Sequence, residues 1–136
     1  MTGLVGCVAD ARASAYGVLH RRYSGRVRVR GRDDGKRLGA AELGRGLGER
    51  ATLVQFSSAF CAPCRATRRV LTEVAAMVPG VTYVEIDAEQ RLELVRELHI
   101  LKTPTVLVLD ADGRIVRRAT GQPRKADVIA ALGEAV

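Results

Sequence analysis

The sequence predicts an α/β layer fold in which a mixed central sheet is flanked by helices and ends in an antiparallel hairpin. Short apolar runs typical of buried strands alternate with helical stretches along most of the chain. Near the C-terminus, a turn sequence joins two strand-like runs with no helix between them. Two cysteines three positions apart follow one apolar run and open the helix after it. These three observations agree on a single α/β domain.

Composition limits the class of protein. A chain of 136 residues is long enough for one domain with a sizeable core. Three cysteines are too few for a disulfide-scaffolded secreted protein, so we expect a reducing compartment and a cytoplasmic protein. The net charge of +7 is unevenly placed: residues 1–50 carry 11 Lys/Arg and 5 Asp/Glu, whereas residues 51–136 carry 11 and 10. The basic excess therefore belongs to the N-terminal third.

Residues 1–25 are predicted to form a basic arm or a degenerate membrane anchor. The stretch from Gly3 to Leu19 is mostly small and apolar, and a basic run follows it. Asp10 and Arg12 oppose insertion, because each costs roughly 2.5–3.5 kcal/mol near a helix centre. A membrane surface remains a candidate partner for residues 1–32. Nucleic acid is disfavoured, because the basic run has almost no interleaved aromatic residues.

The predicted domain spans residues 26–136 and begins with an edge strand. Basic and apolar residues alternate with a period of two over Arg26–Arg30. Residues 31–39 are typical of a polar turn. We expect a short helix over Ala40–Leu47, weakened by nearby glycines, and a buried strand over Leu53–Phe56.

Two helices and a strand are expected in the middle of the chain. The longer helix spans Ala62–Met77 and is ended by Pro79-Gly80. A strand over Val81–Ile86 and a helix over Gln90–Leu98 follow.

The last segment predicts the hairpin and a closing helix. Thr105–Leu109 is apolar throughout, as expected of a fully buried strand, and Arg114–Ala119 returns beside it. Asp110–Gly113 supplies the turn residues, and the helix is expected over Lys125–Leu132.

The segment Phe60-Cys61-Ala62-Pro63-Cys64-Arg65 carries the predicted chemistry. A thiol at a helix N-terminus meets unpaired backbone N–H groups and the positive end of the helix dipole, and both favour the thiolate. Pro63 suits the first helical turn, where its missing N–H costs nothing. Arg65, Arg68 and Arg69 add positive charge with no acid before Glu73. Cys61 can therefore attack a disulfide, and Cys64 can resolve the mixed disulfide.

Two other interpretations of the cysteine pair are weaker. A closed zinc site needs four ligands, and the remaining candidates, Cys7, His20 and His99, show no second paired spacing. A purely structural disulfide usually joins distant segments rather than closing a single turn. The strand, cysteine pair and helix in succession favour a redox motif, with no metal and no cofactor.

From about residue 26 to its end, the chain resembles a thioredoxin. The resemblance covers roughly four fifths of the chain and is carried by these residues: Phe56, Phe60-Cys61-Ala62-Pro63-Cys64-Arg65, Asp87, Lys102-Thr103-Pro104-Thr105, Gly113 and Gly121. It implies a thioredoxin fold and a reductase of protein disulfides that an external thiol reductase regenerates. The alternative is a binding module of the same fold that docks a partner at a membrane surface.

The resemblance also implies roles for individual residues. Cys61 is implied as the nucleophile and Cys64 as the resolving thiol. Thr103-Pro104 is implied as a cis bond facing the cysteines, where substrate backbone docks; a trans proline ending the loop is the alternative. Three further residues would line the substrate groove: Phe60, Ala62 and Gly121.

The chain departs from the family pattern around the motif. The family's buried acid falls at Gln55, its lysine partner at Tyr83, its two tryptophans at Ser57 and Phe60, and its motif glycine at Ala62. Gln55 is therefore expected to support the site by hydrogen bonding. Because an amide cannot accept a proton, water or Cys61 itself must take the proton from Cys64.

The remaining polar residues predict no second site. Glu89, Glu93 and Glu97 recur every four residues, as on the solvated face of a helix. His99 follows at the helix end, where a histidine meets the dipole favourably.

Overall fold

Four strands form one mixed sheet in the order β2-β1-β3-β4. The structure, a computed structural model, describes residues 36–136, so the predicted arm and the predicted strand over Arg26–Arg30 lie outside the described residues. The described elements are, in chain order, α2 (Ala40–Leu43), β1 (Ala51–Ser57), α3 (Ala62–Met77), β2 (Val81–Asp87), the 3₁₀ turn η1 (Ala88–Gln90), α4 (Leu92–Glu97), β3 (Thr105–Asp110), β4 (Ile115–Thr120) and α5 (Lys125–Ala135).

β1 lies at the centre of the sheet, and all of its residues are buried. It pairs in parallel with β2, placing Gln55 opposite Glu85, and antiparallel with β3. A parallel pair needs a crossover connection, which α3 provides. β3 and β4 pair antiparallel. This arrangement confirms the predicted α/β fold and its terminal hairpin.

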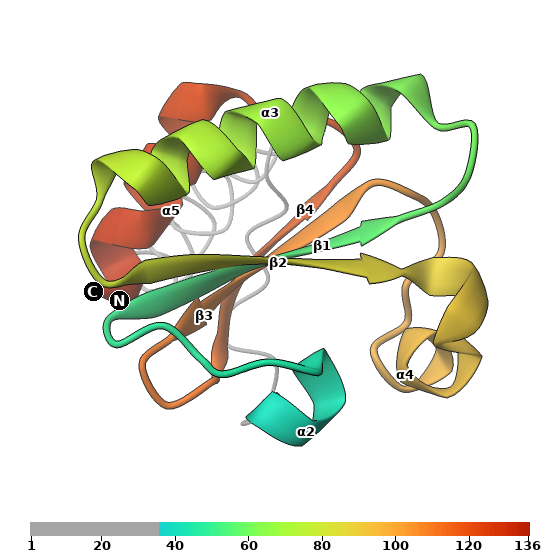
Figure 1. Cartoon of the computed structure of the whole chain (residues 1–136), viewed down its shortest axis with the longest axis horizontal. Coiled ribbons are helices and arrows are strands. Elements are labelled where there is room, and N and C mark those ends of the chain that lie inside the picture. Colours follow the sequence, from blue (N-terminus) through green and yellow to red (C-terminus); the bar gives the residue numbers. More distant parts are fainter. Residues whose placement is uncertain (1–35) are drawn as a thin grey trace, which may run out of the picture.

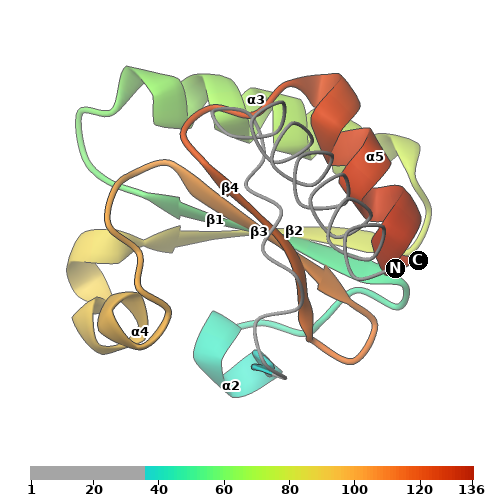
Figure 2. The same ribbon diagram turned by 180° about the vertical axis from the view of Figure 1, so that it is seen from behind.

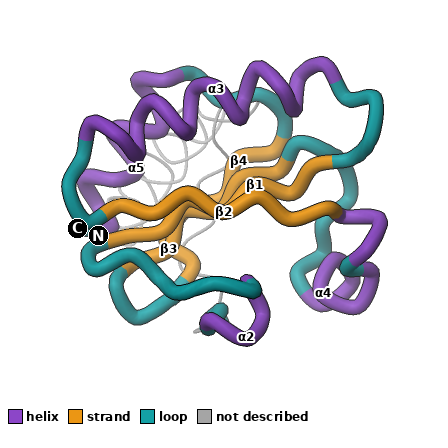
Figure 3. The backbone as a smooth tube through the Cα atoms, viewed as in Figure 1, coloured by secondary structure: helices purple, strands orange, loops and turns teal. Residues whose placement is uncertain are grey.

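The helices cover both faces of the sheet (Figure 1, and from behind Figure 2). α3 and α5 lie on one face, and α2 and α4 lie on the other (Figure 3). Side chains of β1 alternate between these layers: Leu53 packs in the core with residues of α3 and α5, whereas Val54 and Phe56 pack with residues of α2 and α4. Gln55 shares the face of Leu53 and therefore points toward α3.

Most predicted elements agree with the structure within a few residues, and α3 has the predicted bounds. The helix expected over Ala40–Leu47 is shorter, because Gly44 ends α2 with φ 75°. The helix expected over Gln90–Leu98 is divided into η1 and α4, with Arg91 between them at φ −130° and ψ 52°.

The polar turn expected over residues 31–39 is wrong at its C-terminal end. Leu38 is buried in the core with α2 and α4, and its N–H donates to the Gly113 carbonyl at 2.9 Å. Arg37 forms an isolated antiparallel bridge with Arg114. Gly113 has φ 86°, and a Cβ atom there would lie 2.3 Å from the Leu38 carbonyl oxygen, so the hairpin turn needs glycine. This segment therefore belongs to the domain core.

Within residues 36–136, no helix combines the length and apolar character required to cross a membrane.

Candidate active site

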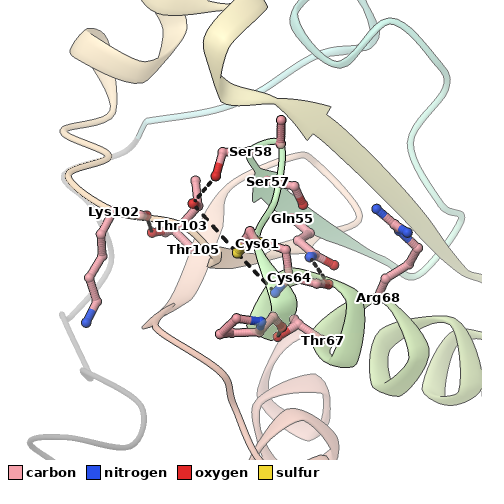
Figure 4. The surroundings of a disulfide bond; sticks show 12 residues. Gln55, Ser57, Ser58, Cys61, Cys64, Thr67, Arg68, Lys102, Thr103 and Thr105 are labelled. Carbon is pink, nitrogen blue, oxygen red and sulfur yellow. Dashed lines mark hydrogen bonds between the residues drawn. A yellow bond between two sulfur atoms is a disulfide. The ribbon is translucent and has the colours of Figure 1, made fainter.

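Cys61 and Cys64 form a disulfide at the start of α3 (Figure 4). Cys61 is the N-cap residue, with extended backbone angles, and its Sγ accepts a hydrogen bond from the Cys64 N–H at 3.2 Å. Cys61 is partly exposed, whereas Cys64 is 1% exposed. The sulfur of Cys61 is therefore accessible at the N-terminus of α3, whereas Cys64 is buried one turn further along the helix.

The loop before β3 lies beside the disulfide. Its Thr103–Pro104 bond is cis, as expected, and Thr103 Oγ1 lies 4.0 Å from Cys61 Sγ. The Gly121 N–H donates to the Pro104 carbonyl at 2.8 Å, with φ 91° at the glycine. The tertiary structure thus brings Pro104 and Gly121 together with the cysteine pair.

Gln55 lies beneath the cysteines and is fully buried. Its Nε2 donates to the Cys64 carbonyl oxygen at 2.8 Å, and its Oε1 accepts from the Tyr83 hydroxyl at 2.8 Å. A carbonyl can only accept and a phenol at neutral pH donates, so these two partners fix the orientation of the amide. Gln55 therefore presents an N–H group, not a base, toward the resolving cysteine.

The Tyr83 hydroxyl remains a donor over a wide pH range. Desolvation raises the pKa of Tyr83 to about 12, and the negative charge of Glu85 acts in the same direction, while Arg68 opposes the shift. Tyr83 is partly exposed, so its side chain extends from the buried amide of Gln55 toward the protein surface.

Arg68 and Glu85 form an ion pair next to Tyr83. Arg68 Nε donates to both carboxylate oxygens of Glu85 at 3.0 Å, and Nη2 donates to one of them at 2.8 Å. Ser57 Oγ donates to the same carboxylate at 2.9 Å. The hydrogen bond and charge of Glu85 raise the pKa of Arg68 above its ordinary value. The prediction that Arg68 adds charge with no nearby acid is therefore wrong, because β2 brings Glu85 to it.

Most residues of the cysteine motif other than the cysteines themselves are exposed around the disulfide. Ala62, Pro63 and Arg65 are exposed on the first turn of α3. The Phe60 side chain is fully exposed, and its backbone has φ 58°. Leu101, just before the cis-proline loop, is 92% exposed. Phe60 and Leu101 thus place exposed apolar side chains on the two loops, next to the exposed charged residues Arg65 and Lys102.

Sequence reasoning did not predict several of the side-chain contacts near the site. Ser58 contacts Thr103 at 2.7 Å between the hydroxyl oxygens, and Glu85 and Ser57 share the network of Arg68. Gln55 and Ser57 are buried on β1, whereas Glu85 is exposed on β2, so their contacts depend on the register of β1 and β2, which no local pattern gives.

Glu89, Glu93, Glu97 and His99 form no metal-binding cluster with other described residues. Glu93, Glu97 and His99 are exposed. Glu89 is also exposed but accepts from the Ala59 N–H at 3.2 Å, so it contacts the loop before Cys61. Residues 36–136 contain no group of three or more His, Cys, Asp or Glu placed to hold a metal ion.

Comparison with known proteins agrees with this geometry. A thioredoxin of Arabidopsis thaliana is 33% identical over 69 residues, which cover 51% of this chain and 44% of that protein, less than half of its length. Mycobacterium tuberculosis thioredoxin is 32% identical over 85 residues, covering 62% of this chain and 72% of the relative. The crystal structure of a Nicotiana alata thioredoxin superposes with a TM-score of 0.56 at 22% identity, over 64% of this chain and 74% of that one.

The sequence profile of the thioredoxin family, described as Thioredoxin, matches residues 44–134. That range contains the cysteine pair, the cis-proline loop and every described strand. This chain belongs to the thioredoxin family.

Proposed function

We propose that this chain reduces disulfide bonds in other proteins through Cys61 and Cys64. Family membership and a CxxC pair at disulfide distance make it a thiol–disulfide oxidoreductase. The observation that carries the proposal is the unequal exposure of the two cysteines, with Cys61 at the surface and Cys64 buried behind it. One sulfur is accessible to a substrate, and the other is close enough to complete the reaction.

The first step starts from the dithiol form. The Cys61 thiolate attacks one sulfur of the substrate disulfide and forms a mixed disulfide, and the other substrate sulfur leaves as a thiolate that takes a proton from water. The helix N-terminus favours the attacking thiolate. The cis-proline loop, the exposed residues Phe60 and Ala62, and the partly exposed Gly121 provide the surface on which the substrate backbone docks.

The second step closes the disulfide seen in the structure. Cys64 loses its proton and attacks Cys61 Sγ, which releases the second substrate sulfur as a thiolate that is protonated in turn. The substrate has then gained two electrons and two protons. Gln55 donates to the Cys64 carbonyl and cannot accept the Cys64 proton, so that proton leaves through water at the mouth of the site. An external thiol reductase supplies two electrons to regenerate the dithiol.

The direct test is insulin reduction followed by turbidity, with dithiothreitol or a thioredoxin reductase as the electron source. Wild-type protein should accelerate precipitation, and Cys61→Ser should reduce the rate to that of the electron source alone. A Cys61→Ser variant as active as wild type would contradict the proposed nucleophile. The alternative, a binding module without redox activity, predicts no acceleration by the wild type either.

Trapping identifies substrates and tests the order of the two steps. In a Cys7→Ser background, Cys64→Ser should accumulate mixed disulfides with proteins in a lysate, because the resolving thiol is missing. The matched Cys61→Ser variant should accumulate none. We place this activity in the cytoplasm, because the small number of cysteines fits a reducing compartment; a membrane contact through residues 1–32 stays a prediction from the sequence.

A further inference from the structure

A chain of two hydroxyl groups ends at the sulfur of Cys61. Ser58 Oγ lies 2.7 Å from Thr103 Oγ1, and Thr103 Oγ1 lies 4.0 Å from Cys61 Sγ. Ser58 belongs to the loop between β1 and α3, whereas Thr103 belongs to the loop before β3. Figure 4 shows the contacts running from Ser58 through Thr103 to Cys61. The two loops that flank the disulfide are therefore joined by a polar contact.

The direction of these hydrogen bonds follows from the protons available. A hydroxyl carries one proton. The sulfur of Cys61 carries none in the disulfide or in the thiolate, so it can only accept, and Thr103 uses its proton to donate to that sulfur. The Thr103 oxygen then accepts from Ser58. The second donor to this sulfur is the Cys64 backbone N–H at 3.2 Å.

We propose that Ser58 and Thr103 form a donor chain that stabilises the Cys61 thiolate. Thr103 is the catalytic member, because its hydroxyl contacts the reacting sulfur, and Ser58 is a positioning residue that acts through Thr103. Hydrogen bonds to the charged form of a group favour that form, and linked hydrogen bonds polarise one another. The inference rests on the role of Cys61 as nucleophile proposed above.

The variants proposed below remove hydroxyl groups and leave every charged side chain near the site unchanged. The charged side chains on the elements beside the site are these: Arg65, Arg68, Arg69 and Glu73 on α3, Glu85 and Asp87 on β2, Glu89 on η1, and Lys102 in the cis-proline loop. Tyr83 and the reduced Cys64 thiol also titrate. All of these groups stay in place in every variant below, so a difference between variants reports the hydroxyl groups.

The experiment measures the pKa of Cys61 in the reduced, full-length protein. Iodoacetamide alkylation of Cys61 is followed by mass spectrometry between pH 4 and pH 10 in a Cys7→Ser background, since only the thiolate reacts. We expect Thr103→Val to raise the pKa of Cys61 by about half a unit to one unit, which lowers the rate below that pKa about threefold to tenfold. Thr103→Ser should restore the wild-type profile.

Two further variants separate the donor chain from simple disturbance of the loop. Ser58→Ala should shift the pKa in the same direction by a smaller amount, because Thr103 still donates but loses its own donor. Thr105→Val is the matched control: its hydroxyl donates to the Lys102 carbonyl at 2.6 Å instead of to the sulfur, so its removal should leave the pKa of Cys61 unchanged.

An unchanged pKa in Thr103→Val, an equal shift in Thr105→Val, or no restoration by Thr103→Ser overturns the inference. If Thr103→Val does not fold, the partly exposed Ser58→Ala carries the test, and an unchanged pKa in that variant overturns the chain. Alkylation needs no substrate, so the result is independent of insulin reduction. If the wild type reduces insulin normally but the variants show no pKa shifts, only the donor chain is refuted. If Cys61 of the reduced wild-type protein does not react with iodoacetamide, the proposed function is refuted.

Discussion

The side-chain amide of Gln55 donates to the backbone carbonyl of Cys64 at 2.8 Å from a fully buried position. The same amide accepts from Tyr83 at 2.8 Å. Both of its hydrogen-bonding groups are therefore used in holding the first turn of α3 onto β1 and β2. This contact stabilises the position of the resolving cysteine but offers it no proton acceptor.

We expect Gln55→Asp to speed the resolving step. A carboxylate at this position can accept the Cys64 proton, directly or through water, whereas the amide cannot. The measurement is single-turnover decay of a preformed Cys61 mixed disulfide near neutral pH. Gln55→Asn is the matched control, because it has the same length as Asp without the basic group. Equal decay rates in Gln55→Asp and Gln55→Asn would mean that the proton travels by another route.

The same substitution should cost stability. The carboxylate would be desolvated, and it has no proton to donate to the Cys64 carbonyl. Loss of one buried hydrogen-bond partner costs about 1–3 kcal/mol, so the free energy of unfolding from a denaturant melt should fall by at least that amount relative to wild type. A Gln55→Asp protein as stable as wild type would show that the buried site tolerates the charge.

Tyr83→Phe should destabilise the protein in a pH-dependent way. Removing the hydroxyl leaves the buried Gln55 Oε1 without its donor, at a cost of about 1–3 kcal/mol near neutral pH. Folding raises the pKa of Tyr83 from 10.0 to about 12, so the folded protein keeps a proton that the unfolded chain releases between these values. The stability advantage of wild type over Tyr83→Phe is therefore full below pH 10 and shrinks as the pH rises toward 12. Denaturant melts of both proteins at pH 7, 10 and 11 measure it, and a constant difference would contradict the assignment.

In the reduced protein, Cys61 should react with alkylating agents before Cys64. Cys61 is partly exposed at the helix N-terminus, whereas Cys64 is 1% exposed beneath the first turn. Limited labelling at pH 7 followed by peptide mapping should find the modification mainly on Cys61. Preferential labelling of Cys64 would reverse the assignment of nucleophile and resolving thiol.

Deleting residues 1–24 should leave insulin reduction near its wild-type rate. The cysteine pair, the cis-proline loop and the buried Leu38 all lie downstream of this deletion. A second deletion, of residues 1–35, tests the predicted strand over Arg26–Arg30: if that strand belongs to the domain, only the longer deletion should lower the denaturation midpoint. Loss of folding in the shorter deletion would move the domain boundary toward the N-terminus.

Local sequence determined the elements and the chemistry of the cysteine pair. Pro63 in the first turn and Pro79-Gly80 after the last one bound α3, because proline and glycine act on the backbone within a few residues. The spacing of Cys61 and Cys64 likewise fixes a disulfide within one turn. The expected helix over Ala40–Leu47 was too long because the left-handed backbone of Gly44 stops α2 early.

Only the tertiary structure decided which side chains surround those cysteines. The parallel register of β1 and β2 brings Tyr83 to Gln55 and Glu85 to Arg68, and the approach of two loops brings Ser58 to Thr103. These partners are 28, 17 and 45 residues apart in the chain. Strand register and loop docking depend on burying both faces of the sheet at once, so no local pattern in the sequence could specify them.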